Sequence, residues 1–208
     1  CTFEAVEGTA SEVRYLVENE VDVFDGLASL VDKSLIRLVE QNTGDSRFEM
    51  LETIREFAAE RLEGDSAFLA AVLLEHASYF AEFTQRQWER LTGSGREAAL
   101  EELSSDLENV RTAWHYWVDK MDLEQLGKFV DSLWLLYDMR GWYLATVALT
   151  TDLLGILSST PSTPELAQQE IVLRTSLARA LLATKGYTPE VEAAYTRALE
   201  LSQAAGEV

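Results

Sequence analysis

Apolar residues recur at intervals of three and four along most of the chain, which predicts helices rather than strands. The clearest case covers residues 96–120, where one apolar stripe is unbroken and predicts a single helix. The stripe consists of Leu100, Leu103, Leu107, Val110, Trp114 and Trp117. Further helices are expected at about 66–88, 123–139, 142–157, 165–184 and 189–205. The chain beyond residue 65 is therefore predicted to be helical throughout.

The first 63 residues have a different pattern, because residues 34–39 partly alternate between apolar and polar and are rich in branched side chains. The expected elements are a helix from Thr2, a helix from Asp22 or Asp25 to Val31, a strand at 34–39, a turn at 42–45, a strand at 47–50 and a helix at 51–62. Helices, a two-stranded hairpin and a closing helix form the outline of a winged-helix unit. Its first helix can be incomplete at the start of the sequence.

Two domains are expected, with the boundary at the segment Glu63-Gly64-Asp65-Ser66, since Gly64 can end one helix and Asp65 can cap the next. Residues 1–63 form the predicted winged-helix unit, and residues 64–208 form a helical domain. A weak internal repeat relates Gly141-Trp142-Tyr143 to Gly186-Tyr187. Paired helices that stack in this way are typical of tetratricopeptide-like solenoids. The fold class is therefore predicted to be mainly α, with a winged helix followed by such a solenoid.

The net charge is −19, from 36 acidic and 17 basic side chains, and the bases are dispersed. Between Arg140 and Arg174 no base occurs. Binding to nucleic acid or to an anionic membrane needs clustered cations, so neither partner is expected. One cysteine excludes an internal disulfide, and no basic-plus-apolar leader is visible. The longest apolar run, Ala67 to Leu74, is too short to span a membrane, so the chain is expected to be cytoplasmic.

Three stretches together resemble a known protein family. They are Asp25-Gly-Leu-Ala-Ser-Leu-Val-Asp-Lys-Ser-Leu-Ile36, Arg47-Phe-Glu-Met-Leu-Glu-Thr-Ile-Arg-Glu-Phe-Ala58 and Asp106-Leu-Glu-Asn-Val-Arg-Thr-Ala-Trp114. The chain is similar to bacterial STAND-class signalling ATPases where their winged helix passes into tetratricopeptide-like repeats. Its last segment, residues 186–201, looks like repeats fused to class III nucleotide (adenylate) cyclases. The same pairing also occurs in transcription regulators with a helix-turn-helix output domain.

The resemblance implies that ATP and Mg²⁺ are bound by a P-loop ATPase domain that precedes the winged helix in the parent protein. No Gly-x-x-x-x-Gly-Lys-Ser/Thr motif occurs here, and Leu91-Thr-Gly-Ser-Gly-Arg96 lacks the lysine. The region itself is therefore expected to be non-catalytic and to need no cofactor. Its implied partners are that ATPase domain and a protein or small-molecule signal.

In the related NB-ARC branch, a Met-His-Asp triplet at the strand-to-helix turn senses the nucleotide phosphate through its histidine. The matching residues here are Met50, Leu51 and Glu52, which are the candidates for nucleotide sensing. Leucine has no donor for a phosphate oxygen. Two alternatives follow: another residue senses the nucleotide, or the winged helix senses the ATPase only through packing.

Aromatic residues cluster within residues 114–143. Trp114, Trp117 and Trp134 are expected in the core, whereas Trp142 and Tyr143 lie at a helix corner and are the candidate protein-contact residues. His76 and His115 have no metal-ligand spacing, and neighbouring acids such as Glu101 and Glu102 are expected on solvated helix faces.

The sequence thus predicts a regulatory and protein-interaction region of a larger STAND-type signalling protein or transcriptional regulator. One alternative is a DNA-binding winged-helix transcription factor, although the expected recognition helix, residues 22–31, is acidic. Another is a helical enzyme with an unrecognised carboxylate pair, and a third is a dimerising solenoid. The identity of the signal is not encoded in any motif.

Overall fold

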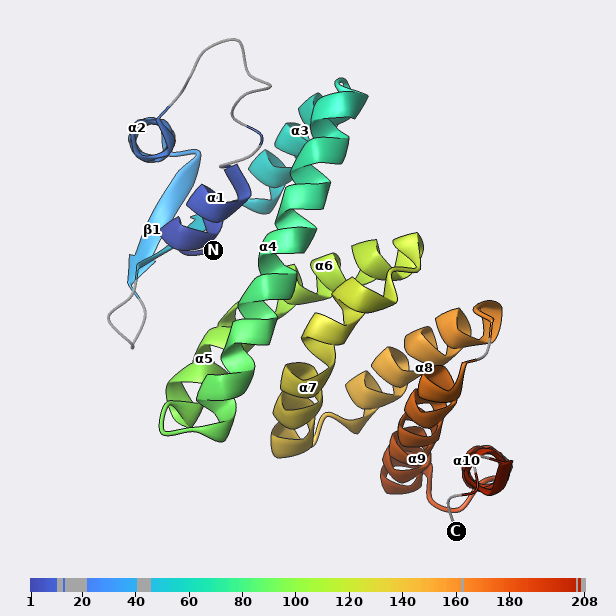
Figure 1. Cartoon of the computed structure of the whole chain (residues 1–208). Coiled ribbons are helices and arrows are strands. Elements are labelled where there is room, and N and C mark those ends of the chain that lie inside the picture. Colours follow the sequence, from blue (N-terminus) through green and yellow to red (C-terminus); the bar gives the residue numbers. More distant parts are fainter. Residues whose placement is uncertain (11–12, 14–21, 41–45, 162, 205, 207–208) are drawn as a thin grey trace. The chain divides into compact units, whose positions relative to one another are not determined.

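The computed structural model describes residues 1–10, 13, 22–40, 46–161, 163–204 and 206. The fold is mainly α with one two-stranded antiparallel sheet, as predicted (Figure 1). The chain forms two compact units, Cys1–Tyr116 and Trp117–Val208, and the division falls within one helix. Residues 64–116 thus share a unit with residues 1–63. A domain boundary at residue 63 stays a prediction.

The first unit begins with the elements expected of a winged helix. They are α1 (Phe3–Ala10), α2 (Val23–Asp32), β1 (Ile36–Glu40), β2 (Ser46–Met50) and α3 (Glu52–Glu63). Asp22 starts α2 by accepting hydrogen bonds from the backbone N–H groups of Phe24 and Asp25 at 2.9 and 3.1 Å. The predicted turn at 42–45 lies outside the described residues. The other predicted elements of this region are confirmed within two residues at their ends.

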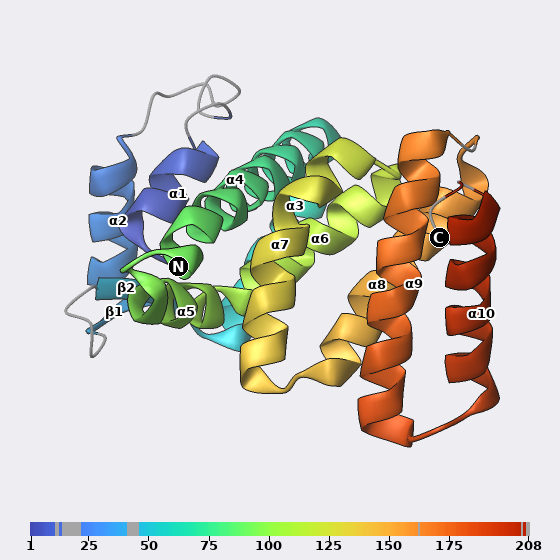
Figure 2. The same cartoon turned by 60° about the horizontal axis from the view of Figure 1, so that its bottom comes forward.

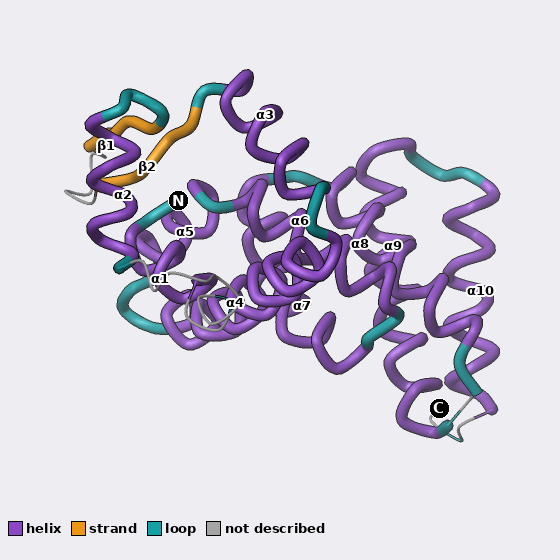
Figure 3. Tube along the Cα trace, turned by 90° about the horizontal axis from the view of Figure 1, so that it is seen from above, coloured by secondary structure: helices purple, strands orange, loops and turns teal. Residues whose placement is uncertain are grey.

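The hairpin pairs Ile36 with Met50 and Leu38 with Phe48, so these four side chains share one face. Phe48 also exchanges two backbone hydrogen bonds with Cys1, at 2.8 and 3.0 Å, which fixes the start of the chain against β2. In Figure 3 the two strands are orange and a short loop leads from β2 into α3. The opposite face carries Arg37 and Arg47.

The rest of the first unit consists of helices α4 (Ser66–Thr92), α5 (Arg96–Ser105) and the first part of α6 (Leu107–Lys120). The prediction of one helix over 96–120 is wrong, because the helix is interrupted at Asp106. The backbone of Asp106 leaves helical geometry there, with φ −104° and ψ 12°. Its carboxylate bonds to other side chains, described below, instead of lying on a solvated helix face. The predicted stripe survives the break, and its core members are Leu103, Leu107, Val110, Trp114 and Trp117.

The second unit contains α7 (Leu123–Arg140), α8 (Tyr143–Ser159), α9 (Pro164–Lys185) and α10 (Pro189–Ala204). α7 ends at Gly141 and α9 ends at Gly186, both with positive φ (67° and 73°), a backbone conformation that favours glycine. The two glycines predicted to repeat therefore occupy equivalent corners. Figure 2 shows α9 and α10 side by side, and their contact is built on Ala178, Leu181, Val191 and Ala194.

The predicted helices of this unit are confirmed, and α8 continues to Ser159, two residues beyond its predicted end. Whether these helix pairs are tetratricopeptide-like stays a prediction. Within the part of the chain that the structure describes, no helix is both long enough and apolar enough to cross a bilayer.

Candidate functional site

A buried ion pair joins the hairpin to the helices of the first unit. The Arg47 guanidinium on β2 forms a bidentate pair with Asp106, in which Arg47 Nη1 lies 2.8 Å from Asp106 Oδ2. The same guanidinium donates to the Ser105 carbonyl at 3.2 Å, and the Asn109 amide donates to Asp106 Oδ1 at 2.9 Å. The two charged side chains are only 11% and 5% exposed. The break between α5 and α6 therefore positions a carboxylate for the hairpin.

A second charged network lies between α4 and α5. Arg90 Nη2 bonds to Glu102 Oε1 at 2.6 Å, and the buried side chain of Gln87 bonds to both Arg90 and Glu102 at 3.0 Å. These hydrogen bonds from Arg90 hold the pKa of the Glu102 carboxyl below its usual range. Glu102 is therefore suited to an ion pair and not to donating a proton as a general acid.

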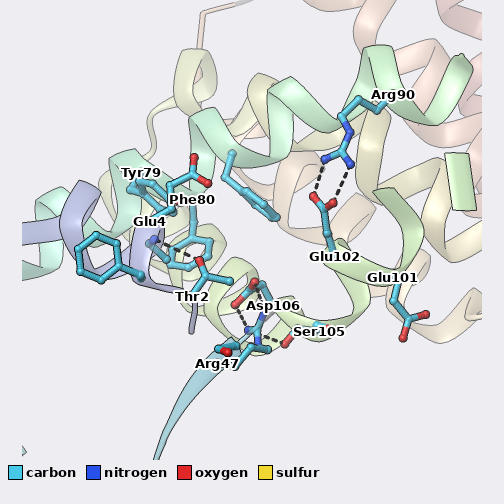
Figure 4. A pocket seen from close by; sticks show the side chains of 14 residues that line it. Thr2, Glu4, Arg47, Tyr79, Phe80, Arg90, Glu101, Glu102, Ser105 and Asp106 are labelled. Atoms are coloured by element: carbon cyan, nitrogen blue, oxygen red, sulfur yellow. Dashed lines mark hydrogen bonds and ion pairs between the residues drawn. The ribbon is translucent and has the colours of Figure 1, made fainter. Parts of the chain in front are cut away.

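The two networks border one cavity of about 570 Å³. Its walls come from the start of α1, from β2, and from α4 and α5, with aromatic side chains on α4. In Figure 4 Arg47 and Arg90 point to their carboxylate partners, whereas Glu101 points away from both pairs. Because both guanidinium groups already hold a carboxylate, neither is available to an anionic ligand without breaking a pair.

Burial shifts the pKa values of two side chains near this cavity. Burial, together with the negative charge of Glu4, raises the pKa of Tyr79 to about 12. Burial lowers the pKa of His76, against a hydrogen bond with Asn109 and the charge of Asp106. The His76 ring lies on Phe80, with 4.7 Å between the ring centroids. His76 is thus a packed, neutral histidine, whereas the other histidine, His115, is exposed.

No catalytic constellation emerges in the described ranges. No group of three or more His, Cys, Asp or Glu side chains there could hold a metal ion. The acidic residues at 101 and 102 do not converge on one point, since Glu102 binds Arg90 while Glu101 points away (Figure 4). The charged residues around this cavity hold the hairpin against the helices.

Several apolar side chains of the first unit are exposed on α3 and on the hairpin that precedes it. Helix α3 carries apolar side chains at three- and four-residue steps, yet none of its residues is buried. Leu51 and Phe57 are 58% and 54% exposed. Leu38 and Met50 on the hairpin are exposed as well. We call Leu38, Met50, Leu51 and Phe57 the α3 surface. Such an amphipathic helix normally buries its apolar stripe against a neighbour.

Two of the predicted nucleotide-sensing residues, Met50 and Leu51, belong to this surface, and Glu52 follows them in the chain. Met50 ends β2, Leu51 precedes the first turn of α3, and Glu52 opens the helix and pairs with Arg55 at 2.6 Å. A phosphate would meet a thioether, an aliphatic chain and a carboxylate, none of which donates a hydrogen bond. These side chains do not fit a phosphate group, so any sensing role for them stays a prediction based on packing.

The elements that would meet DNA carry few free cations. In a winged helix the second helix of the helix-turn-helix and the hairpin are the contact elements. Helix α2 exposes Asp25 and Asp32, with Lys33 just beyond it. On the hairpin, Arg37 is paired with Glu49 at 2.7 Å and Arg47 is held by Asp106. Among described residues, the charge of this face therefore does not favour a duplex.

The predicted contact residues Trp142 and Tyr143 lie at the corner between α7 and α8 and are 38% and 37% exposed. The Trp142 ring packs on Tyr137, with 6.2 Å between centroids. Trp114 and Trp117 are buried as predicted, and Trp134 is half-buried. Trp142 and Tyr143 belong to the second unit, whereas Met50, Leu51 and Glu52 belong to the first.

Sequence reasoning missed the pairing of Arg47 with Asp106, whose members are 59 residues apart. A signal was present: an Asp placed immediately before Leu107 and three residues before Asn109 is a common start of a helix. The apolar stripe continues across the break, however, and so predicted one uninterrupted helix.

Comparison with known proteins gives one result. A family model described as a winged helix-turn-helix domain matches residues 5–63. No curated protein and no solved structure matches the chain. A domain of this kind indicates a DNA-binding or regulatory role. Since the family match and the order of α1, α2, the hairpin and α3 agree, residues 5–63 form a winged helix-turn-helix domain.

Proposed function

We propose that this chain is a non-catalytic regulatory region whose winged helix-turn-helix domain docks on another protein domain through the α3 surface. The observation that carries the proposal is α3 itself: a helix of 12 residues with an apolar stripe and no buried residue. Leu51 and Phe57 are 58% and 54% exposed, so burying the remainder of each would add roughly half of the ~1.5–3 kcal/mol that complete burial of such a side chain provides. A partner domain that binds this surface, permanently or reversibly, would bury these side chains.

The partner that the sequence supports is a P-loop ATPase domain of the same parent protein. The resemblance to STAND-class ATPases places such a domain before the winged helix, and the α3 surface includes Leu51 at the turn where related proteins contact the nucleotide-binding domain. With leucine at that position, docking would depend on the state of the ATPase through packing and not through a phosphate contact.

In this proposal the helix pairs of the second unit receive the regulatory signal. Trp142 and Tyr143 are exposed aromatic side chains at a helix corner, and aromatic residues are favoured anchors in protein interfaces. A signal bound there would shift the balance between docked and undocked arrangements of the parent, and so its output.

The test is calorimetric binding of the separately expressed ATPase domain of the parent to this chain, with ATP, with ADP and without nucleotide. We expect binding that changes with the nucleotide, and a loss of about tenfold or more in Leu51→Arg. Leu144→Arg is the matched control, because Leu144 is a helical leucine that is 69% exposed in the other unit. Absence of binding in all three states, or equal losses in both variants, would refute docking through α3.

A second candidate is DNA binding, which the winged helix-turn-helix match itself favours. Fluorescence anisotropy with a labelled duplex at two salt concentrations separates the two proposals. Affinity that falls steeply with salt and is insensitive to Leu51→Arg would support DNA binding. The acidic face of α2 and the paired arginines of the hairpin favour the opposite result.

A further inference from the structure

The second unit contains a cavity of about 540 Å³ between α7, α8 and α9. Its floor is formed by Leu153 and Leu157 on α8 and by Leu173 on α9, all of which are buried. Val130 and Trp134 on α7 complete the apolar lining. Cavities of roughly 300–1,000 Å³ with mostly apolar walls are typical of small-molecule sites in proteins.

The polar groups of the cavity are few, and those that carry charge are all acidic. Asp131 on α7 and Glu165 on α9 supply carboxylates, and Gln168 and Gln169 supply amides. No lysine or arginine lines it among the described residues. A carboxylate, phosphate or sulfonate inside would be repelled by the two acids and would find no counter-charge. The lining therefore selects against anions.

One donor in the wall has no partner. The indole N–H of Trp134 is buried, and no described group accepts its hydrogen bond. A buried donor left unpaired costs free energy, so tryptophan N–H groups in protein interiors usually find an acceptor. The same side chain also borders a pocket of about 80 Å³, which has no room for an organic ligand of several rings. A pocket of that size still holds water, whereas only the larger cavity has space for an organic molecule that brings an oxygen.

We propose that the cavity between α7, α8 and α9 binds a small, uncharged, mainly apolar molecule that carries an oxygen acceptor for the Trp134 indole N–H. This site is separate from the α3 surface and does not depend on the docking proposed above. Leucine, valine and indole surfaces provide the affinity, the indole N–H orients the oxygen, and the two carboxylates exclude anions.

The test uses two fluorescent naphthalene probes of similar size on the full 208-residue chain. Prodan is neutral and carries a ketone oxygen, whereas anilinonaphthalene sulfonate is an anion. Prodan should bind with a Kd of roughly 10–200 µM, as expected for a ligand of its size. The sulfonate should bind at least about tenfold more weakly because of Asp131 and Glu165. Equal or tighter binding of the sulfonate, or no binding of prodan, overturns the proposal.

A matched pair of glycine variants locates the probe. A Cβ added at Gly127, which lines the cavity on α7, meets no atom within 4 Å, and the same is true of Gly155 on α8, outside the cavity. Both glycines are inside helices, so leucine is compatible with the fold at either position. Gly127→Leu should weaken prodan about tenfold or more by filling the space, and Gly155→Leu should leave it unchanged. Prodan bound elsewhere, for instance on the α3 surface, would ignore Gly127→Leu and refute the site.

Trp134→Phe tests whether the bound molecule accepts a hydrogen bond from the indole N–H. Phenylalanine keeps one aromatic ring but lacks both the N–H donor and the five-membered ring of the indole, so prodan affinity should fall about tenfold or more. In a ¹⁵N-labelled chain, the indole resonance that is missing from Trp134→Phe should shift when prodan is added to the parent chain. Unchanged affinity together with an unshifted resonance would show that the site does not use the N–H and would overturn the acceptor requirement.

Discussion

Cys1–Tyr116 has a buried ion pair beside its apolar core, whereas in Trp117–Val208 the contact between α9 and α10 is aliphatic. In the first unit, Arg47 and Asp106 are almost fully buried and hold the hairpin against the helices. In the second, the contact between α9 and α10 rests on Ala178, Leu181, Val191 and Ala194, and its ion pairs, such as Arg197 with Glu170, stay partly exposed. The first unit therefore depends on matched charged partners where the hairpin meets the helices, and the contact between α9 and α10 depends on apolar burial.

The largest effect is expected from removing one partner of the buried pair. Asp106→Ala leaves the Arg47 charge buried without compensation and should destabilise the first unit by about 3–5 kcal/mol. Hydrogen exchange measured by mass spectrometry should show the loss in the hairpin and α5 and not in α9 or α10. Arg47→Met combined with Asp106→Leu should recover most of it, since two apolar side chains replace the pair. A cost below about 1 kcal/mol for Asp106→Ala would contradict this account of the first unit.

Leu181→Ala is the corresponding test of the second unit. Leu181 is buried among small side chains, and its truncation should cost about 3 kcal/mol, typical of a buried leucine. Urea unfolding followed by exchange in α9 and α10 should report the loss. Leu199→Ala serves as the control, because Leu199 is an exposed leucine on α10 and its truncation should change stability by less than about 0.5 kcal/mol. Equal costs for the two leucines would show that α10 is not packed as described.

The same substitution should have opposite signs in the two units. A Cβ at Gly8 on α1 would lie 2.4 Å from the Tyr79 ring, so Gly8→Ala should destabilise the first unit by about 1–3 kcal/mol. At Gly155 on α8 nothing lies within 4 Å, and Gly155→Ala should stabilise by about 0.5–1 kcal/mol through helix propensity. Thermal unfolding of the two variants tests this, and a stabilising Gly8→Ala would mean that α1 does not pack on Tyr79.

The smallest expected effect is a pH dependence confined to the first unit. The pKa of His76 is lowered by burial, so the folded state favours the neutral ring and the unfolded state binds the proton more readily. The stability that neutral His76 provides is present above the unfolded pKa of about 6.5 and is lost as the pH falls below it. Between pH 7 and 5 the first unit should weaken, and His76→Asn should reduce the slope. The second unit has no histidine and should show no such step.

The sequence predicted the elements well because each depends on neighbours close along the chain. Asp22 caps the helix that it precedes, and Gly141 ends the one that it follows. The exposure of α3 could not be predicted, because an apolar stripe records that a face needs burial and not whether a partner is present. Arg47 and Asp106 could not be paired either, since nothing local relates positions 59 residues apart. The cavity near Trp134 depends on three helices and has no motif at all.

The pairing of Arg47 with Asp106 also bears on how the protein is made. The winged helix-turn-helix domain ends near residue 63. Asp106, whose carboxylate pairs with Arg47 of the hairpin, is synthesised more than 40 residues later. While the ribosome adds α4 and α5, the nascent domain therefore carries an arginine without its acid. It reaches its final stability only when residue 106 has left the exit tunnel. A shortened version that stops at the family boundary would stay in that unfinished state permanently.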